Sequence, residues 1–202
     1  MLRALSAVLL AALALPAQQP ADEPVAPKDP YTEGEAEAMQ AAGIVGYGPF
    51  PWADGVSTTD VDKVLGSGRM IWMETAHFRI GSNLRPTKVP EEAEEKKALQ
   101  AEVRALREKL PKVKDKPRQL DPWLRMHLYA QRAEQLYAEW CAMVGVTDAD
   151  FGEGKAVRSG KYLGLPDKFL VLLFDKKSDL ARYMDRFAGV KADKSYRHYH
   201  QK

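Results

Sequence analysis

The chain has 202 residues, of which 45% are hydrophobic and 29% are charged, a composition typical of a globular protein. Its 30 Lys and Arg residues nearly balance 28 Asp and Glu residues, so the charge gives no reason to expect a nucleic-acid-binding surface. The single Cys excludes an intramolecular disulfide and any multi-cysteine zinc or iron–sulfur site. This length predicts one domain with short extensions.

The N-terminus has the layout of a secretory signal peptide. Arg3 precedes an almost purely apolar run from Ala4 to Leu15, and the small residue Ala17 follows before the chain turns polar. An uncleaved membrane anchor is the alternative, but about a dozen apolar residues are too few to cross roughly 30 Å of hydrocarbon. We therefore expect residues 1–17 to be a signal peptide, the protein to be exported to the periplasm or beyond, and no membrane span to remain after cleavage.

The next segments are predicted to form a tether and then a single domain. Proline-rich residues lead into a short helix over Thr32–Ala42, so 18–42 is expected to be a tether and 43–202 one globular domain. The aromatic residues between Tyr47 and Trp52 alternate with turn formers and are expected to fill an edge of the core. The alternative is an exposed aromatic patch, which would make the chain an interaction module.

Two elements are predicted in the first half of the domain. Residues 70–80 alternate polar and apolar side chains, which predicts one strand with one buried face. Residues 90–110 begin with Pro90 and carry an apolar stripe at spacings of three and four, which predicts a helix. The basic loop Lys112–Gln119 has no interleaved aromatic residue, so we expect a solvated connection and no nucleic-acid partner.

The second half is predicted to form a helix, a strand and another helix. Asp121 and Pro122 start a helix over 121–144 whose stripe from Met126 to Met143, including Trp140, is expected to be buried. The continuous apolar run at 168–175 predicts a strand buried on both faces, and 178–188 predicts a helix. The fold class is therefore α/β, with α+β as the alternative.

This set of elements is short of strands, because a sheet of two strands is marginal by itself. Either Trp52–Val64 supplies another strand, or the domain is incomplete at its C-terminus and the chain is the front part of something longer.

Glu74 and His77 are the candidate catalytic residues. If buried, the carboxyl group of Glu74 would act as an acid, and the alternative is an ion pair with Arg125 or Arg132. His77 lies on the polar face of the strand predicted over 70–80, which suits a rim histidine. Cys141 lies near the end of a helix, where its thiol is expected to be inert core filler.

His198 and His200 are the candidate metal ligands, because they would share one face of a strand. Two ligands do not make a site, and the alternative is an exposed polar tail. We predict no cofactor, since the sequence contains no His-Glu-x-x-His zinc motif and no phosphate-binding glycine pattern.

The segment WMETAHFRI at 72–80 resembles the strand that opens the domain of many peptidase-MA-like (gluzincin) metallohydrolases. The resemblance implies a long helix, an apolar strand and a short amphipathic helix after it, which match the elements expected over 121–144, 168–175 and 178–188. It also implies a later zinc-binding helix, to which no position here corresponds. The segment from Asp29 to Trp52 is similar to that of exported bacterial proteins of planctomycete type.

These patterns lead to three functional hypotheses. The first is an exported, non-catalytic scaffold that resembles the front half of a gluzincin-like domain and recognises an envelope protein or peptide. On this hypothesis the chain has no hydrolase activity, and it would use zinc only if a longer chain supplied the His-Glu-x-x-His helix. The second is an envelope enzyme that uses Glu74 and His77, and the third is an interaction module that uses the Tyr47–Trp52 aromatic segment.

Overall fold

The computed structural model describes residues 28–53, 55–66, 70–152 and 160–191. The predicted signal peptide, residues 18–27 of the predicted tether, and His198 and His200 lie outside these ranges. The described residues form a mixed α/β fold with five α-helices, a four-stranded sheet and two two-stranded sheets, as the sequence predicts in class. No helix among them is both long enough and apolar enough to cross a bilayer.

The main sheet has the strand order β1-β4-β5-β8. Its strands are β1 (Ile44–Tyr47), β4 (Ile71–Thr75), β5 (Phe78–Ser82) and β8 (Phe169–Leu173). The pairs β1–β4 and β4–β5 are antiparallel, whereas β5–β8 is parallel. A crossover therefore joins β5 to β8, and it contains α3 (Ala93–Lys109) and α4 (Pro122–Val144).

The prediction of one strand over 70–80 is wrong, because the chain reverses at Ala76 and His77. The hydroxyl group of Thr75 accepts a hydrogen bond from the backbone N–H of Phe78 at 3.3 Å, which closes the turn locally. The reversal places Met73 beside Ile80, and both side chains are fully buried on the same face. Alternation alone could not show it, since a two-residue turn between strands keeps the period of two.

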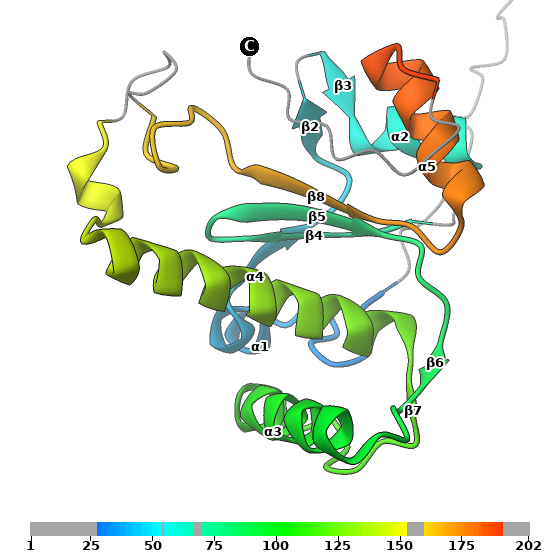
Figure 1. Cartoon of the computed structure of the whole chain (residues 1–202), viewed down its shortest axis with the longest axis vertical. Coiled ribbons are helices and arrows are strands. Elements are labelled where there is room, and N and C mark those ends of the chain that lie inside the picture. Colours follow the sequence, from blue (N-terminus) through cyan, green and yellow to red (C-terminus); the bar gives the residue numbers. More distant parts are fainter. Residues whose placement is uncertain (1–27, 54, 67–69, 153–159, 192–202) are drawn as a thin grey trace, which may run out of the picture.

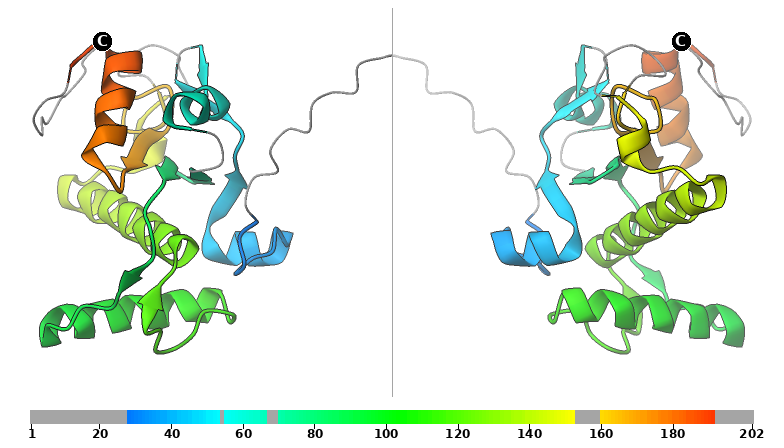
Figure 2. Two further views of the ribbon diagram at one scale, coloured as in Figure 1. Left: turned by 90° about the vertical axis from the view of Figure 1, so that its right-hand side faces the viewer. Right: turned by 90° about the vertical axis from the view of Figure 1, so that its left-hand side faces the viewer.

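The sheet is covered on both faces (Figures 1 and 2). On one face lie α4 and α1 (Ala36–Ala42), with α3 packed on the far side of α4. On the other face lie α2 (Thr58–Leu65), α5 (Lys177–Tyr183) and the small hairpin of β2 (Pro51–Ala53) and β3 (Val56–Ser57). The short strands β6 (Thr87–Lys88) and β7 (Gln119–Leu120) pair where the chain enters and leaves α3.

The predicted helices are present, with shifted bounds. The carboxylate of Asp121 accepts hydrogen bonds from the N–H groups of Trp123 and Leu124, which caps α4, and Gly145 ends it with a positive φ of 72°. The helix expected over 90–110 starts later, because the side chain of Glu92 caps α3. The helix expected over 178–188 is α5 followed by a π-helical turn at Met184–Ala188.

The burial predicted along α4 is correct only in its N-terminal half. Leu124 and Leu128 face α3, while Met126 and Ala130 face the sheet, so this half is buried on two sides. In the C-terminal half only Tyr137 and Cys141 of the apolar residues are buried, and the predicted stripe is exposed: Leu136 by 66%, Trp140 by 44% and Met143 by 81%. No second layer covers this half among the described residues, because α3 packs against the other end (Figure 1).

Two strand predictions also need correction. The strand expected to be buried on both faces is β8, which lies at the edge of the sheet and leaves Leu170 42% exposed. Trp52–Val64 does not join the main sheet, since it forms the small hairpin and α2, and β1 supplies the additional strand instead. Within the segment predicted to be a tether, Asp29 and Thr32 are buried.

Gly81 tests the packing of the β4–β5 pair. A Cβ atom at Gly81 would lie 2.2 Å from Cζ3 of Trp72 and 2.8 Å from Cδ2 of Leu172, so the side chains on that face would have to move. We expect Gly81→Ala to lower the free energy of unfolding by about 1–3 kcal/mol. Urea denaturation at an unchanged m-value measures this.

The matched control is Gly46→Ala in β1, where a Cβ atom would meet nothing within 4 Å. We expect it to change the free energy of unfolding by less than about 0.5 kcal/mol. Equal losses in the two variants would contradict the close approach of Trp72 to Gly81.

Candidate functional site

The most concentrated polar cluster around a predicted site residue is centred on His77, in the turn between β4 and β5. Its Nδ1 atom lies 2.6 Å from Oε2 of Glu134, and its backbone N–H donates to Oε1 of the same carboxylate at 3.0 Å. Its Nε2 atom lies 2.9 Å from Oδ2 of Asp148, in the 3₁₀ helix Asp148–Asp150 that follows α4. Both ring nitrogens therefore face carboxylates from distant parts of the chain.

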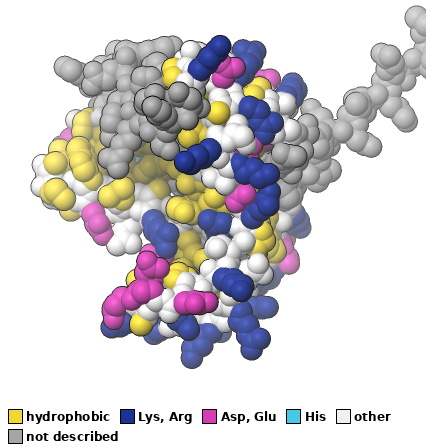
Figure 3. All heavy atoms as spheres, turned by 45° about the vertical axis from the view of Figure 1, so that its right-hand side comes forward, with side chains coloured by type: hydrophobic (Ala, Val, Ile, Leu, Met, Phe, Trp, Pro, Cys, Tyr) yellow, Lys and Arg dark blue, Asp and Glu magenta, His cyan; other side chains and the backbone are white. Residues whose placement is uncertain are grey.

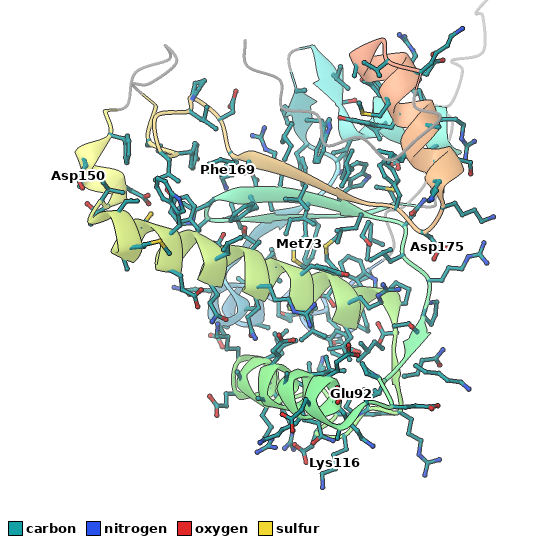
Figure 4. The ribbon with its side chains drawn as sticks, viewed as in Figure 1. Met73, Glu92, Lys116, Asp150, Phe169 and Asp175 are labelled. Carbon is teal, nitrogen blue, oxygen red and sulfur yellow. The ribbon has the colours of Figure 1, made fainter. Side chains whose placement is uncertain are left out.

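Tyr137 completes this cluster. Its ring stacks on the imidazole of His77 with centroids 3.8 Å apart and planes 15° apart, and its hydroxyl group donates to Oδ1 of Asp148 at 2.5 Å. The C-terminal half of α4, the start of β8 at Phe169 and the helical turn that contains Asp150 come together on this side of the molecule (Figure 4). The cluster itself joins the β4–β5 turn, α4 and the 3₁₀ helix.

The carboxylates determine the protonation of the cluster. Burial by itself would lower the pKa of His77, but the hydrogen bonds and charges of Glu134 and Asp148 outweigh it and raise the pKa. The hydroxyl group of Tyr137, together with His77, lowers the pKa of Asp148 despite partial burial. The two carboxylates therefore favour the imidazolium form of His77, and His77 could act as a base only if Nε2 left Asp148.

Glu74, the other predicted catalytic residue, lies on the face of β4 that carries Trp72, away from α4. Its Oε1 atom is 3.1 Å from Nε of Arg79 and 3.3 Å from Nζ of Lys168. The structure therefore does not bring Glu74 and His77 into one site. An ion pair was the expected alternative for Glu74, but its partners are Arg79 and Lys168.

The two arginines proposed for Glu74 are engaged elsewhere. Arg132 pairs with Glu102 at 2.6 Å, and Arg125 donates to the backbone carbonyl of Arg85 at 2.5 Å. Cys141 is buried, as predicted. In the part of the chain that the structure describes, no three His, Cys, Asp or Glu side chains are grouped to hold a metal ion.

The aromatic segment from Tyr47 to Trp52 faces inward. Trp52 is only 2% exposed, packs on Trp72 and donates from Nε1 to the hydroxyl group of Tyr183 at 3.0 Å. Tyr47 donates its hydroxyl hydrogen to Oδ2 of Asp29. This geometry favours the core-edge interpretation of the segment over an exposed binding patch.

A second polar cluster, which no sequence pattern predicts, is almost completely buried. Oδ2 of Asp29 is 2.9 Å from Nε2 of His127 and also accepts hydrogen bonds from the hydroxyl groups of Thr32 and Tyr47. Burial alone would raise the pKa of Asp29, but His127 and the other donors lower it to about 2. Asp29 and His127 are 98 residues apart, so no local pattern connects them. The cluster fastens the N-terminal segment to α4.

The C-terminal half of α4 also carries an exposed apolar surface. Leu136, Trp140, Met143 and Val144 project from one side of the helix and are 44–81% exposed; these four residues are called the α4 apolar face below. Figure 3 shows hydrophobic side chains gathered at the left of the molecule, the side to which this half of α4 extends, while Lys and Arg side chains are prominent toward the right and the bottom.

Comparisons with known proteins return no relative. No protein-family model matches the chain, and no curated protein and no solved structure matches it either. One fold supports many functions, so the function of this chain depends on the particular residues that the fold brings together.

The buried Asp29 cluster makes the free energy of unfolding depend on pH in the acid range. Because the pKa of Asp29 is near 2 in the folded protein and near 3.8 ordinarily, its contribution is complete above about pH 4 and is lost as the pH falls toward 2. We expect this contribution to be about 2 kcal/mol. Between pH 4.5 and pH 2, the free energy of unfolding of the wild type should fall by about 2 kcal/mol more than that of Asp29→Asn, as measured by urea denaturation.

The control for this prediction is Glu37→Gln, which removes an exposed carboxylate from α1. It should keep the acid sensitivity of the wild type. If Asp29→Asn and the wild type lose the same stability in acid, the carboxylate of Asp29 is not held as the structure indicates.

Proposed function

We propose that this chain is a non-catalytic, exported scaffold resembling the front half of a gluzincin-like metallohydrolase domain. On this proposal the α4 apolar face is the surface against which a helix carrying the reactive groups packs. The observation that carries the proposal is the exposure of Leu136, Trp140 and Met143 on one side of a capped helix. The order of elements after the WMETAHFRI segment adds support through the resemblance.

The chemistry of the α4 apolar face suits a helical partner. Leu136, Trp140 and Met143 are spaced by four and three residues, so they form one ridge along α4. Helix-in-groove recognition uses anchors at this spacing, and a partly exposed Trp is a frequent anchor of such contacts. Covering these side chains would remove apolar surface from water, which stabilises a complex by about 25 cal/mol per Å² before the cost of association.

The side chains predicted for catalysis support the non-catalytic part of the proposal. Glu74 is paired with Arg79 and Lys168, and both ring nitrogens of His77 face carboxylates. The zinc ligands that the family resemblance implies belong to a His-Glu-x-x-His helix, and this motif does not occur in the 202 residues. An enzyme that uses His77 is the second candidate, favoured by Glu134, which orients the imidazole at Nδ1 as a catalytic carboxylate would.

Charged substitutions on the α4 apolar face test the docking surface. We expect the double variant Trp140→Glu/Met143→Glu to lower the free energy of unfolding by at most about 2 kcal/mol, because Met143 is 81% exposed and Trp140 is 44% exposed. The same variant should bind less of the hydrophobic dye ANS, and any self-association of the wild type in light scattering should weaken. Both changes are expected if the α4 apolar face is the surface through which the protein binds apolar partners.

The matched control is Val45→Glu, which places a carboxylate at another exposed apolar position, in β1. It should leave dye binding and self-association as in the wild type. Equal effects at Val45 and on α4 would contradict a specific docking face.

The non-catalytic part of the proposal is tested by a zinc titration together with a peptidase assay. Tight one-to-one zinc binding with turnover would refute a non-catalytic role.

A further inference from the structure

The number of protons on His77 limits which contacts of its cluster can exist together. A neutral imidazole has one N–H donor and one acceptor nitrogen, whereas a carboxylate only accepts. Nδ1 lies 2.6 Å from Glu134 and Nε2 lies 2.9 Å from Asp148. Both hydrogen bonds therefore form only when both ring nitrogens carry a proton, so loss of one proton must break one of them.

The structure indicates which bond breaks. Glu134 accepts from both Nδ1 and the backbone N–H of His77, and its side chain is 29% exposed. Asp148 makes one contact with His77, and its side chain is 51% exposed, so water can replace that contact. The remaining proton consequently stays on Nδ1, and the lone pair of Nε2 then faces the carboxylate of Asp148.

The charges around His77 come from several elements. On α4, the carboxylate of Glu134 and the ring of Tyr137 face it, and on the 3₁₀ helix Asp148 faces it. From the loop before β8, Tyr162 presents an edge to the imidazole, and the ammonium group of Lys161 acts on Asp148. Lys168 is turned away, since it bonds to the carbonyl of Thr75 and to Glu74.

Among these described groups, the two carboxylates of Glu134 and Asp148 outweigh the ammonium group of Lys161, so the electrostatic potential at His77 favours the imidazolium. The pKa of His77 is correspondingly raised above its ordinary 6.5, although burial opposes the shift. The cluster therefore stabilises the folded protein fully below about pH 6.5, and this stabilisation is lost as the pH rises through the higher pKa that His77 has in the folded state.

We propose that His77, Glu134 and Asp148 form a pH-operated clasp, in which doubly protonated His77 holds the chain leaving α4 against the β4–β5 turn and the neutral form releases it. The held segment begins at Gly145, directly after Met143 and Val144 of the α4 apolar face. Tyr137 still donates to Asp148 after release, so the opening is a local loosening rather than unfolding. This inference does not depend on the proposed function.

Two measurements on the intact protein test the clasp. The ¹⁵N shifts of the His77 ring report its protonation. Hydrogen exchange at Asp150 and Phe151, whose amides are bonded within the held segment, and at Val146, whose amide bonds back to Cys141 of α4, reports the order of the segment. We expect His77 to titrate above pH 6.5. Protection factors, corrected for the intrinsic effect of pH, should fall about three- to tenfold through that titration, because one charge-assisted hydrogen bond is lost at a partly exposed site.

Variants separate the clasp from general pH effects. His77→Gln should remove the pH dependence of protection, and Asp148→Asn should lower the midpoint of His77 and lower protection below that midpoint. Asp150→Asn is the matched control, because Asp150 lies in the same 3₁₀ helix and bonds to Thr147 instead of His77.

The inference is overturned if His77 titrates at or below pH 6.5, if protection is independent of pH in the wild type, or if Asp150→Asn acts like Asp148→Asn. Should His77→Gln fail to fold, the comparison of Asp148→Asn with Asp150→Asn decides by itself.

Discussion

The packing of α4 between the main sheet and α3 is the constraint on which the rest of this fold depends. Its N-terminal half is buried on both sides, with Leu124 and Leu128 against α3 and Met126 and Ala130 against the sheet. Burying each of the leucine and methionine side chains contributes about 1.5–3 kcal/mol. The Asp29–His127 contact then fastens the N-terminal segment to the same half, so the helix acts as the common support of three layers.

The position of α4 also creates the polar cluster. The helix runs beneath the β4–β5 pair, so the turn that carries His77 meets Glu134 and Tyr137 one helical turn apart. The chain after Gly145 then brings Asp148 to the other ring nitrogen. Glu74, although only three residues from His77, points to the opposite face of the sheet, where Arg79 and Lys168 neutralise it. Proximity in sequence therefore says little about which polar groups share a site.

The α4 apolar face and the His77 cluster lie in the same half of the helix. The C-terminal half of α4 has one buried face, whereas the N-terminal half has two, and this difference leaves Leu136, Trp140 and Met143 exposed. It also allows the contact between His77 and Asp148 just after the helix ends to depend on pH. A scaffold that receives a partner helix would use such an end, because it combines apolar anchors with a segment of adjustable order.

The sequence by itself determined the class of the fold, the ends of α4 at Asp121 and Gly145 and the inward-facing aromatic segment ending at Trp52, because caps, proline and periodicity act within a few residues. Only the tertiary structure decided that 70–80 is a hairpin, that β8 is an edge strand and that one half of α4 is exposed. Periodicity shows that a face is apolar, but not whether another element covers it. His77 was identifiable as a candidate, but its partners were not, since Glu134 and Asp148 are 57 and 71 residues away and only folding brings their charges to the imidazole.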